Sequence, residues 1–254
     1  MNLRTGEWRR GFTYRYCCGL LCWLSTIASA HAAEFLLPNL PPFAYTVRGV
    51  SAGIEAELVA EVLRRMQRND SVTVVPLARA TVNARGKPNI LTFLGRTPAR
   101  EQRYLWLVPL IEEQFLLFTR RDSTVEIHNL DVARRLAVGV TRNSIGEELA
   151  QRLNFIYLKP SRDEETNVRK LMSGRIDAWL GGRNGALEAA AHVGIPRGDL
   201  REGLVLENYV VWLAASLETP PAEASRWRDA FEAVRVDGTL ARILHKHSYL
   251  PSSK

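Results

Sequence analysis

The sequence predicts an α/β protein made of two lobes with a cleft between them. After residue 33, short apolar segments of strand type alternate with segments of helical periodicity, and the connections are short. Such alternation is typical of parallel βαβ units. It runs in two series, 34–118 and 123–205, which indicates two lobes. A cleft between lobes is a common place for a small ligand.

The first series has four expected strands and three helical segments. In the longest helical segment Ile54, Leu58 and Val62 recur every four residues, which places them on one face. A proline-rich turn at 38–42 follows the first strand. The expected strands are 34–37, 72–75, 89–94 and 114–119, and the helical segments are 53–67, 78–85 and 98–102.

The second series repeats the alternation and the chain then ends in two helices. Ser144 or Asn143 is expected to cap the helix that runs to Arg152, because short polar side chains accept hydrogen bonds from free helix-end amides. The strand 208–215 can cross back to the first lobe. The expected strands are 136–140, 155–158, 178–180 and 208–215, and the helices are 130–134, 144–152, 163–172, 185–192, 221–236 and 240–247.

The first 32 residues have the pattern of a cleavable export signal. Four arginines precede a short apolar run, 19–27, and small residues follow at Ala28, Ala30 and Ala32. The run is far shorter than the roughly 20 residues of a membrane-spanning helix. We therefore expect export to the periplasm, with cleavage between Ala30 and Ala33.

The sequence offers two variants of the export signal. Cys22 as a lipid-anchor cysteine is disfavoured because Leu21 before it is too large for that motif. Arg9-Arg10 resembles part of a twin-arginine signal, so the choice between the Sec and the twin-arginine route stays open, with Sec favoured.

Composition excludes several classes of function. All three cysteines lie in the signal, so the mature chain has no disulfide, no cysteine-ligated metal and no cysteine nucleophile. Removing the signal lowers the net charge from +7 to +4, because it takes away four arginines and one glutamate. No basic block remains, which argues against nucleic-acid binding.

No catalytic or cofactor pattern is found in the mature chain. It lacks a Ser-His-Asp pattern, a phosphate-binding glycine loop and a His/Asp metal cluster. We therefore expect no enzyme activity, no metal and no cofactor.

The segment 89–109 points to an anion site. An apolar strand ends at Gly95, and Thr97-Pro98 then has the pattern of a helix start, with Thr as cap and Pro at the first position. Arg100 falls within that first turn. A guanidinium beside free helix-end amides suits a carboxylate or another small anion.

Six motifs in register resemble family 3 of the bacterial extracellular solute-binding proteins. They cover nearly the whole mature chain, and they are Pro41–Tyr45 with Gly53–Leu58, then Pro76–Ala80, Arg96–Glu101, Val138–Gly146, Ser173–Ala178 and Val236–Leu244. The resemblance implies a type II periplasmic binding-protein fold, in which two α/β lobes close by a hinge over a small polar solute, most often an amino acid. The hinge strands would lie near 116–119 and 209–213. Lobe 1 would comprise 33–118 and 212–254, and lobe 2 would comprise 119–211.

Members of this family usually serve an ABC transporter, some are sensor modules, and a few are dehydratases. The resemblance therefore implies a monomeric periplasmic protein that delivers a carboxylate-bearing solute to an inner-membrane permease. A receptor partner, or a dehydratase of the same fold, is the alternative.

The resemblance also implies the residues that bind the solute. Arg100 matches the arginine that pairs with the solute's carboxylate, a role for which its fork geometry suits it better than lysine. Thr97 belongs to the same motif. The other matched positions are Thr92 and Phe93 at the strand end of lobe 1, and Arg142, Ser144 and Gly146 in the facing loop of lobe 2.

Two departures from the family pattern concern charge. The acid that usually holds a ligand's ammonium is replaced by Gly182, and the other common acidic position falls near Leu37. Arg79 stands where many members place an aromatic side chain. This predicts an arginine-rich site for a ligand with several negative groups or without an ammonium. The alternative is that Glu57, Asp163 or Glu164 supplies the acid.

Overall fold

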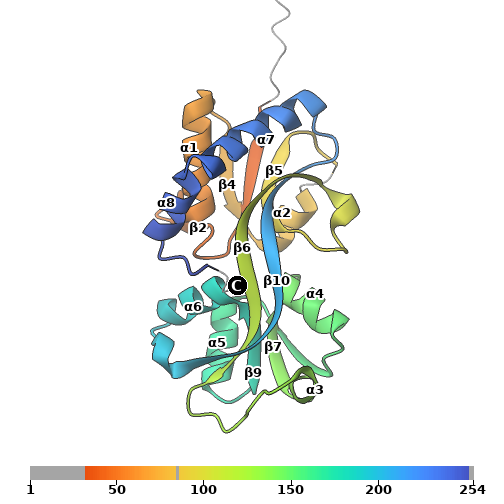
Figure 1. Cartoon of the computed structure of the whole chain (residues 1–254), viewed down its shortest axis with the longest axis vertical. Coiled ribbons are helices and arrows are strands. Elements are labelled where there is room, and N and C mark those ends of the chain that lie inside the picture. The colour runs from red at the N-terminus through yellow and green to blue at the C-terminus, as the bar shows by residue number, and fades with distance from the viewer. Residues whose placement is uncertain (1–31, 84–85, 252–254) are drawn as a thin grey trace, which may run out of the picture. The chain divides into compact units, whose positions relative to one another are not determined.

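The computed structural model describes residues 32–83 and 86–251, which belong to one compact unit and form two lobes (Figure 1). The expected export signal lies outside the described residues, apart from Ala32. Within the described part of the chain, no helix is long and apolar enough to cross a membrane.

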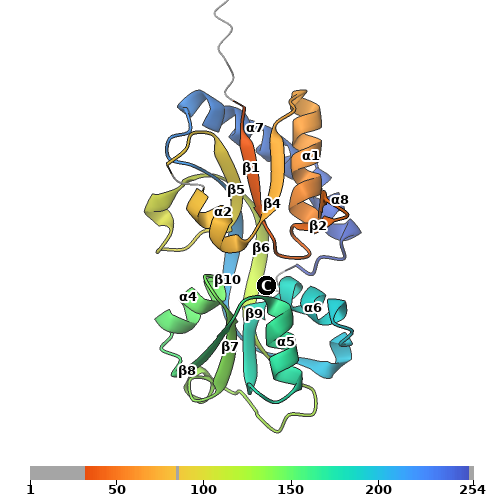
Figure 2. The ribbon, with the colours of Figure 1, turned by 180° about the vertical axis from the view of Figure 1, so that it is seen from behind.

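One eight-stranded sheet runs through both lobes in the order β4-β1-β5-β10-β6-β9-β7-β8. Its two central strands, β6 (Leu105–Arg120) and β10 (Leu200–Ala215), are antiparallel neighbours of 16 residues each. Both strands pass from one lobe to the other, as Figures 1 and 2 show from opposite sides. They are the two hinge strands, and each lobe adds its own strands to one end of the pair.

Lobe 1 is built on parallel strands next to the end of β10. Strand β1 (Glu34–Pro38) lies between β4 (Ser71–Val75) and β5 (Ile90–Gly95), and β5 pairs antiparallel with β10. The core includes Phe35 and Trp227, whose rings meet edge to face at 5.1 Å. The helices of this lobe are α1 (Ile54–Met66), α2 (Leu77–Asn83), α7 (Pro221–Val236) and α8 (Thr239–Lys246), with a short 3-10 turn, η1 (Glu101–Arg103).

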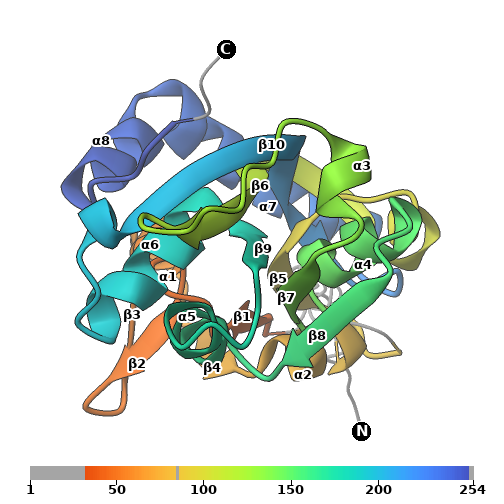
Figure 3. The same cartoon turned by 90° about the horizontal axis from the view of Figure 1, so that it is seen from below.

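Lobe 2 repeats this plan beyond β6. Strand β9 (Ala178–Gly182) pairs with β6, and β7 (Ala137–Thr141) lies between β9 and β8 (Tyr157–Ser161). Residues of β6 alternate between two cores: Phe115 packs under α4, and Leu116 packs under α5 and α6. Figure 3 shows these helices on opposite sides of the strands. The helices are α3 (Leu130–Ala133), α4 (Ile145–Arg152), α5 (Glu164–Met172) and α6 (Arg183–His192), with the 3-10 turn η2 (Arg197–Asp199).

Apart from the helical segment 98–102, the expected elements are present, and the α/β class with two lobes and two hinge strands is confirmed. Two parts were not predicted. The first is the hairpin of β2 (Tyr45–Val47) and β3 (Val50–Ala52), which turns through Arg48 and Gly49, both at positive φ. The second is the full length of β6 and β10, of which only 114–119 and 208–215 were expected. The exact lobe limits remain a prediction.

Candidate binding site

The carboxyl ends of the parallel strands in the two lobes face each other. Arg100 and Glu148, which follow β5 and β7 respectively, bond across the lobes. The backbone after β1 also meets α6, because an ideal Cβ at Gly185 lies 3.6 Å from the carbonyl oxygen of Pro41. In open α/β sheets, ligands bind beyond the carboxyl ends of the strands. The candidate site therefore lies where these ends meet.

Arg100 is held between the lobes by a carboxylate of the same chain. Its Nε and Nη2 donate to Oε1 of Glu148 at 3.0 and 2.5 Å. The hydroxyl of Thr97 donates to the other oxygen, Oε2, at 3.2 Å. Arg100 is only 5% exposed, whereas the side chain of Glu148 is 35% exposed. The predicted carboxylate anchor is thus buried, and its donors already hold a carboxylate.

The local structure around Arg100 differs from the prediction. No helix begins at Pro98; residues 98–100 form a turn in which the Arg100 amide donates to Thr97 O at 2.9 Å, and η1 begins only at Glu101. Arg100 is the residue that precedes η1. The segment expected to start a helix therefore forms a turn. This turn places the Arg100 guanidinium against lobe 2.

Gly95 lets α4 approach the end of β5. An ideal Cβ at Gly95 would lie 2.0 Å from Cδ1 of Ile145 and 2.8 Å from Cδ2 of Tyr209. Ile145 is the first residue of α4, and Tyr209 belongs to the hinge strand β10, where its ring stacks on Phe115 at 4.8 Å. The side chains of Ile145 and Tyr209 therefore occupy the space that a larger residue at position 95 would need.

The predicted loop of lobe 2 builds the start of α4. Ser144, not Asn143, caps the helix: its hydroxyl accepts from the Glu147 amide at 3.2 Å and donates to Thr141 O at 2.6 Å. Gly146 is buried, and an ideal Cβ there would lie 3.3 Å from Leu180 O. This close packing of α4 on β9 fixes the direction in which α4 faces lobe 1.

Of four other predicted site residues, two are buried in lobe 1 and two are exposed. Phe93 is 2% exposed and packs on Phe231 in the core of lobe 1, with the ring centroids 5.9 Å apart. Thr92 is fully buried in β5 opposite Ala214. The side chains of Arg79 and Arg142 are exposed. Contacts of these four with a solute remain predictions.

A buried acid stands beside Gly182, at the position where the expected acid is missing. An ideal Cβ at Gly182 would lie 3.5 Å from Cγ of Glu113 and 3.6 Å from the hydroxyl of Tyr209. Glu113 comes from the hinge strand β6 and is 1% exposed. It accepts from the Gln114 amide at 2.9 Å and from Nδ2 of Asn184 at 3.2 Å. Burial raises the pKa of Glu113 to about 7.

The sequence missed both acids of this site. Glu148 lies within the expected helix 144–152 without being singled out, and Glu113 lies just before the expected strand 114–119. A signal for Glu113 existed, because Glu112-Glu113 interrupts an apolar run from Leu105 to Leu117. Charged residues in such a run call for a partner or a function.

The three alternative acids have other contacts. Glu57 binds Lys246 and His247 at 2.9 Å within lobe 1. Asp163 caps α5 by accepting from the Thr166 amide at 2.8 Å. Glu164 accepts from the indole N–H of Trp179 at 2.9 Å, and burial raises the pKa of Glu164 to about 7.

Two acids lie at or beside the junction. Arg100 is the cation that bonds across the lobes, and Glu148 is its partner. Glu113 is a second acid and lies beside Gly182. The side chains of Arg79 and Arg142 are exposed, and their role in a site stays a prediction.

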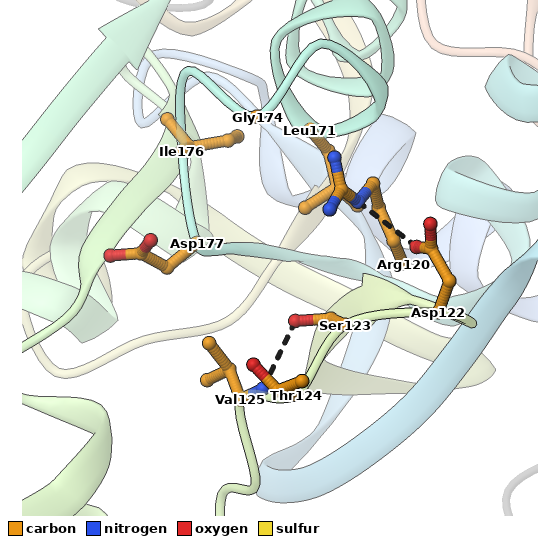
Figure 4. A pocket seen from close by; sticks show the side chains of 9 residues that line it. All are labelled: Arg120, Asp122, Ser123, Thr124, Val125, Leu171, Gly174, Ile176 and Asp177. Carbon is orange, nitrogen blue, oxygen red and sulfur yellow. Dashed lines mark hydrogen bonds and ion pairs between the residues drawn. The ribbon is translucent and has the colours of Figure 1, made fainter.

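A separate cavity of about 280 Å³ lies in lobe 2 (Figure 4). It is lined by the end of β6 and by the turn before β9, including Arg120, Gly174 and Asp177, and Arg120 is paired with Asp122 at 3.2 Å. Strand β9 starts at this cavity and ends at Gly182, so the cavity and the junction lie at opposite ends of the strand. Within the described ranges, no cluster of three or more metal-ligating side chains is present.

Comparison with solved structures gives the same architecture. The chain is similar to a histidine kinase sensor domain that resembles periplasmic binding proteins, with 17% identity, 85% of this chain and 95% of that chain covered, and a TM-score of 0.76. It is similar to a histidine-bound substrate-binding protein of an ABC uptake transporter from Streptococcus pneumoniae, with 16% identity, 88% and 95% covered, and a TM-score of 0.74. A third similar structure is an ancestral amino acid-binding protein, a precursor of cyclohexadienyl dehydratase, with 15% identity, 85% and 94% covered, and a TM-score of 0.68. No protein-family model and no curated protein matches the chain.

Proposed function

The chain has the type II periplasmic binding-protein fold, and on this premise we propose that it captures a small polar solute bearing a carboxylate between its lobes. The observation that carries the proposal is the position of Arg100. It is 5% exposed, comes from lobe 1 and directs its guanidinium at a carboxylate of lobe 2. An arginine in this position offers a bidentate site for a carboxylate and links solute capture to hinge closure.

We further propose that the solute is an amino acid or a close relative. Glu113, beside Gly182, takes the role of the acid that receives an ammonium group, because a buried carboxylate favours a cationic partner. Arg100 and Glu113 would then hold opposite charges of one zwitterion.

The protein is proposed to act after export to the periplasm, as the solute-binding partner of an ABC permease. A sensing role with a membrane receptor is the second candidate, because a sensor domain is among the similar structures. Both roles use the same site, and a pull-down of the membrane partner separates them. We expect no turnover of prephenate or arogenate by the purified protein, which separates both roles from a dehydratase.

Titration calorimetry on the purified protein tests the proposal. The panel contains neutral and basic amino acids, dicarboxylates and a carboxylate without an ammonium. At least one solute should bind, and Arg100→Met should weaken it by 100-fold or more, since about 3 kcal/mol is typical of a lost buried charge contact. Arg103→Met, an exposed change in the same turn, is the control. Absence of binding across the panel, or equal binding by Arg100→Met, would contradict the proposal.

A further inference from the structure

Glu148 uses the donors that the proposed solute would need. Both Nε and Nη2 of Arg100 point at Oε1 of Glu148, and the Thr97 hydroxyl reaches Oε2. These two nitrogens form one edge of the guanidinium, the edge that holds a carboxylate in a fork. A solute carboxylate therefore cannot take this edge while Glu148 holds it.

The position of Glu148 is set by helix α4. Ile145 and Glu148 are three residues apart and share one face of the helix. Ile145 packs on Gly95 while Glu148 reaches Arg100, so α4 touches the first lobe at two points. Ser144 and Gly146 fix the helix start on the second lobe, as described above. The contact is thus a consequence of how α4 is seated.

We propose that Glu148 is a built-in competitor for the Arg100 site, and that it selects which solutes bind; this rests on the function proposed above. It holds Arg100 when no solute is present and must leave when a solute's carboxylate arrives. The buried Arg100 guanidinium is then always paired with a carboxylate. Leaving it unpaired would lower the stability of the folded protein.

Intramolecular competition explains selection. A carboxylate tethered within reach acts at a high effective concentration, so a solute must exceed that competition before it binds. The apparent affinity is the intrinsic affinity multiplied by the fraction of molecules in which the site is free. A simple carboxylate with no second contact is rejected, whereas a solute that also engages Glu113 gains enough free energy to displace Glu148.

Partial exposure makes the contact reversible. Fully exposed ion pairs contribute little, and breaking a buried pair is strongly unfavourable. Arg100 is nearly buried, but the side chain of Glu148 is 35% exposed, so a departing Glu148 carboxylate meets water at once. This difference in exposure allows Glu148 to leave the contact while Arg100 stays in place.

Glu148→Gln tests the proposal, with Glu147→Gln on the same helix turn as the control. Glu147 accepts from the Asn143 amide and does not contact Arg100. We expect Glu148→Gln to bind the best solute of the panel about tenfold more tightly, equivalent to about 1.4 kcal/mol. Acetate should raise the melting temperature of Glu148→Gln but not that of the wild type or Glu147→Gln.

A second measurement needs no solute. Small-angle scattering of the solute-free protein should give a larger radius of gyration for Glu148→Gln than for the wild type and Glu147→Gln, because the interlobe pair is lost. Unchanged scattering and no response to acetate would overturn the proposal, even if no solute of the panel binds. Weaker solute binding by Glu148→Gln would also overturn it, since Glu148 would then assist binding.

Discussion

Gly95 shows how one missing side chain lets two lobes meet. The nearest atom to an ideal Cβ at Gly95 is Cδ1 of Ile145, at 2.0 Å, which real side chains do not tolerate. The clash would be with flexible side chains of α4 and the hinge and not with backbone. The residue therefore controls how closely α4 can approach β5.

Gly95→Ala should hold the lobes further apart. The added methyl group overlaps Ile145 and the Tyr209 ring, and overpacking of this kind costs about 1–3 kcal/mol. We expect a larger radius of gyration by scattering and weaker solute binding. Gly198→Ala is the control, because an ideal Cβ there has no atom within 4 Å. Identical scattering by both variants would show that Ile145 does not limit the approach.

Glu113 should make stability depend on pH. Burial raises the pKa of Glu113 from 4.5 to about 7, so between these values the folded chain binds a proton that the unfolded chain has lost. The free energy of unfolding therefore falls as pH rises through this window, by up to about 3 kcal/mol. The full contribution is present below pH 4.5.

Glu113→Gln should flatten that pH dependence, because glutamine stays neutral. Urea unfolding at about pH 5 and about pH 8 measures it. Glu164→Gln should flatten it too, since the pKa of Glu164 is also raised to about 7. A Glu113→Gln protein with the full wild-type slope would contradict the account of this carboxyl group.

At the scale of elements, helix α4 joins the fold to the site. It starts with the Ser144 cap, packs on β9 through Gly146 and faces lobe 1 through Ile145 and Glu148. Loss of the Ser144 cap should therefore lower the stability of the protein and change its affinity for the solute.

Ser144→Ala should destabilise the protein by about 1 kcal/mol, the usual cost of losing a helix cap. Chemical unfolding measures the change. Ser173→Ala is the matched control, because Ser173 is exposed and its hydroxyl donates to Lys170 O at the end of α5 without capping a helix start. Equal stability of the two variants would show that the Ser144 hydroxyl does not support α4.

Local chemistry explains which elements the sequence predicted. Helices with periodic faces and short polar caps, such as the one that follows Asp163, were found because their signals lie within a few residues. The long hinge strands were truncated, because Pro109 and Glu112-Glu113 break the apolar pattern of β6. Pairing with β10 along nearly its whole length makes β6 a strand, and that information is not local.

At the scale of the whole molecule, the site was predicted in part. The motifs singled out Arg100, Ser144 and Gly146; Arg100 bonds across the lobes, Ser144 and Gly146 form the start of α4, and their contacts with a solute stay predictions. The partner of Arg100 was not foreseen, because Glu148 is 48 residues away and reaches it only through the packing of one lobe on the other. The acid beside Gly182 was missed for the same reason, since Glu113 approaches from a different strand.

The most direct test of the account is a crystal structure of the protein with the tightest solute of the panel. We predict the solute's carboxylate on the Nε and Nη2 edge of Arg100, with Glu148 displaced and the ammonium near Glu113. A solute bound elsewhere, for example in the cavity beside Arg120, with the Arg100–Glu148 pair intact, would contradict the account.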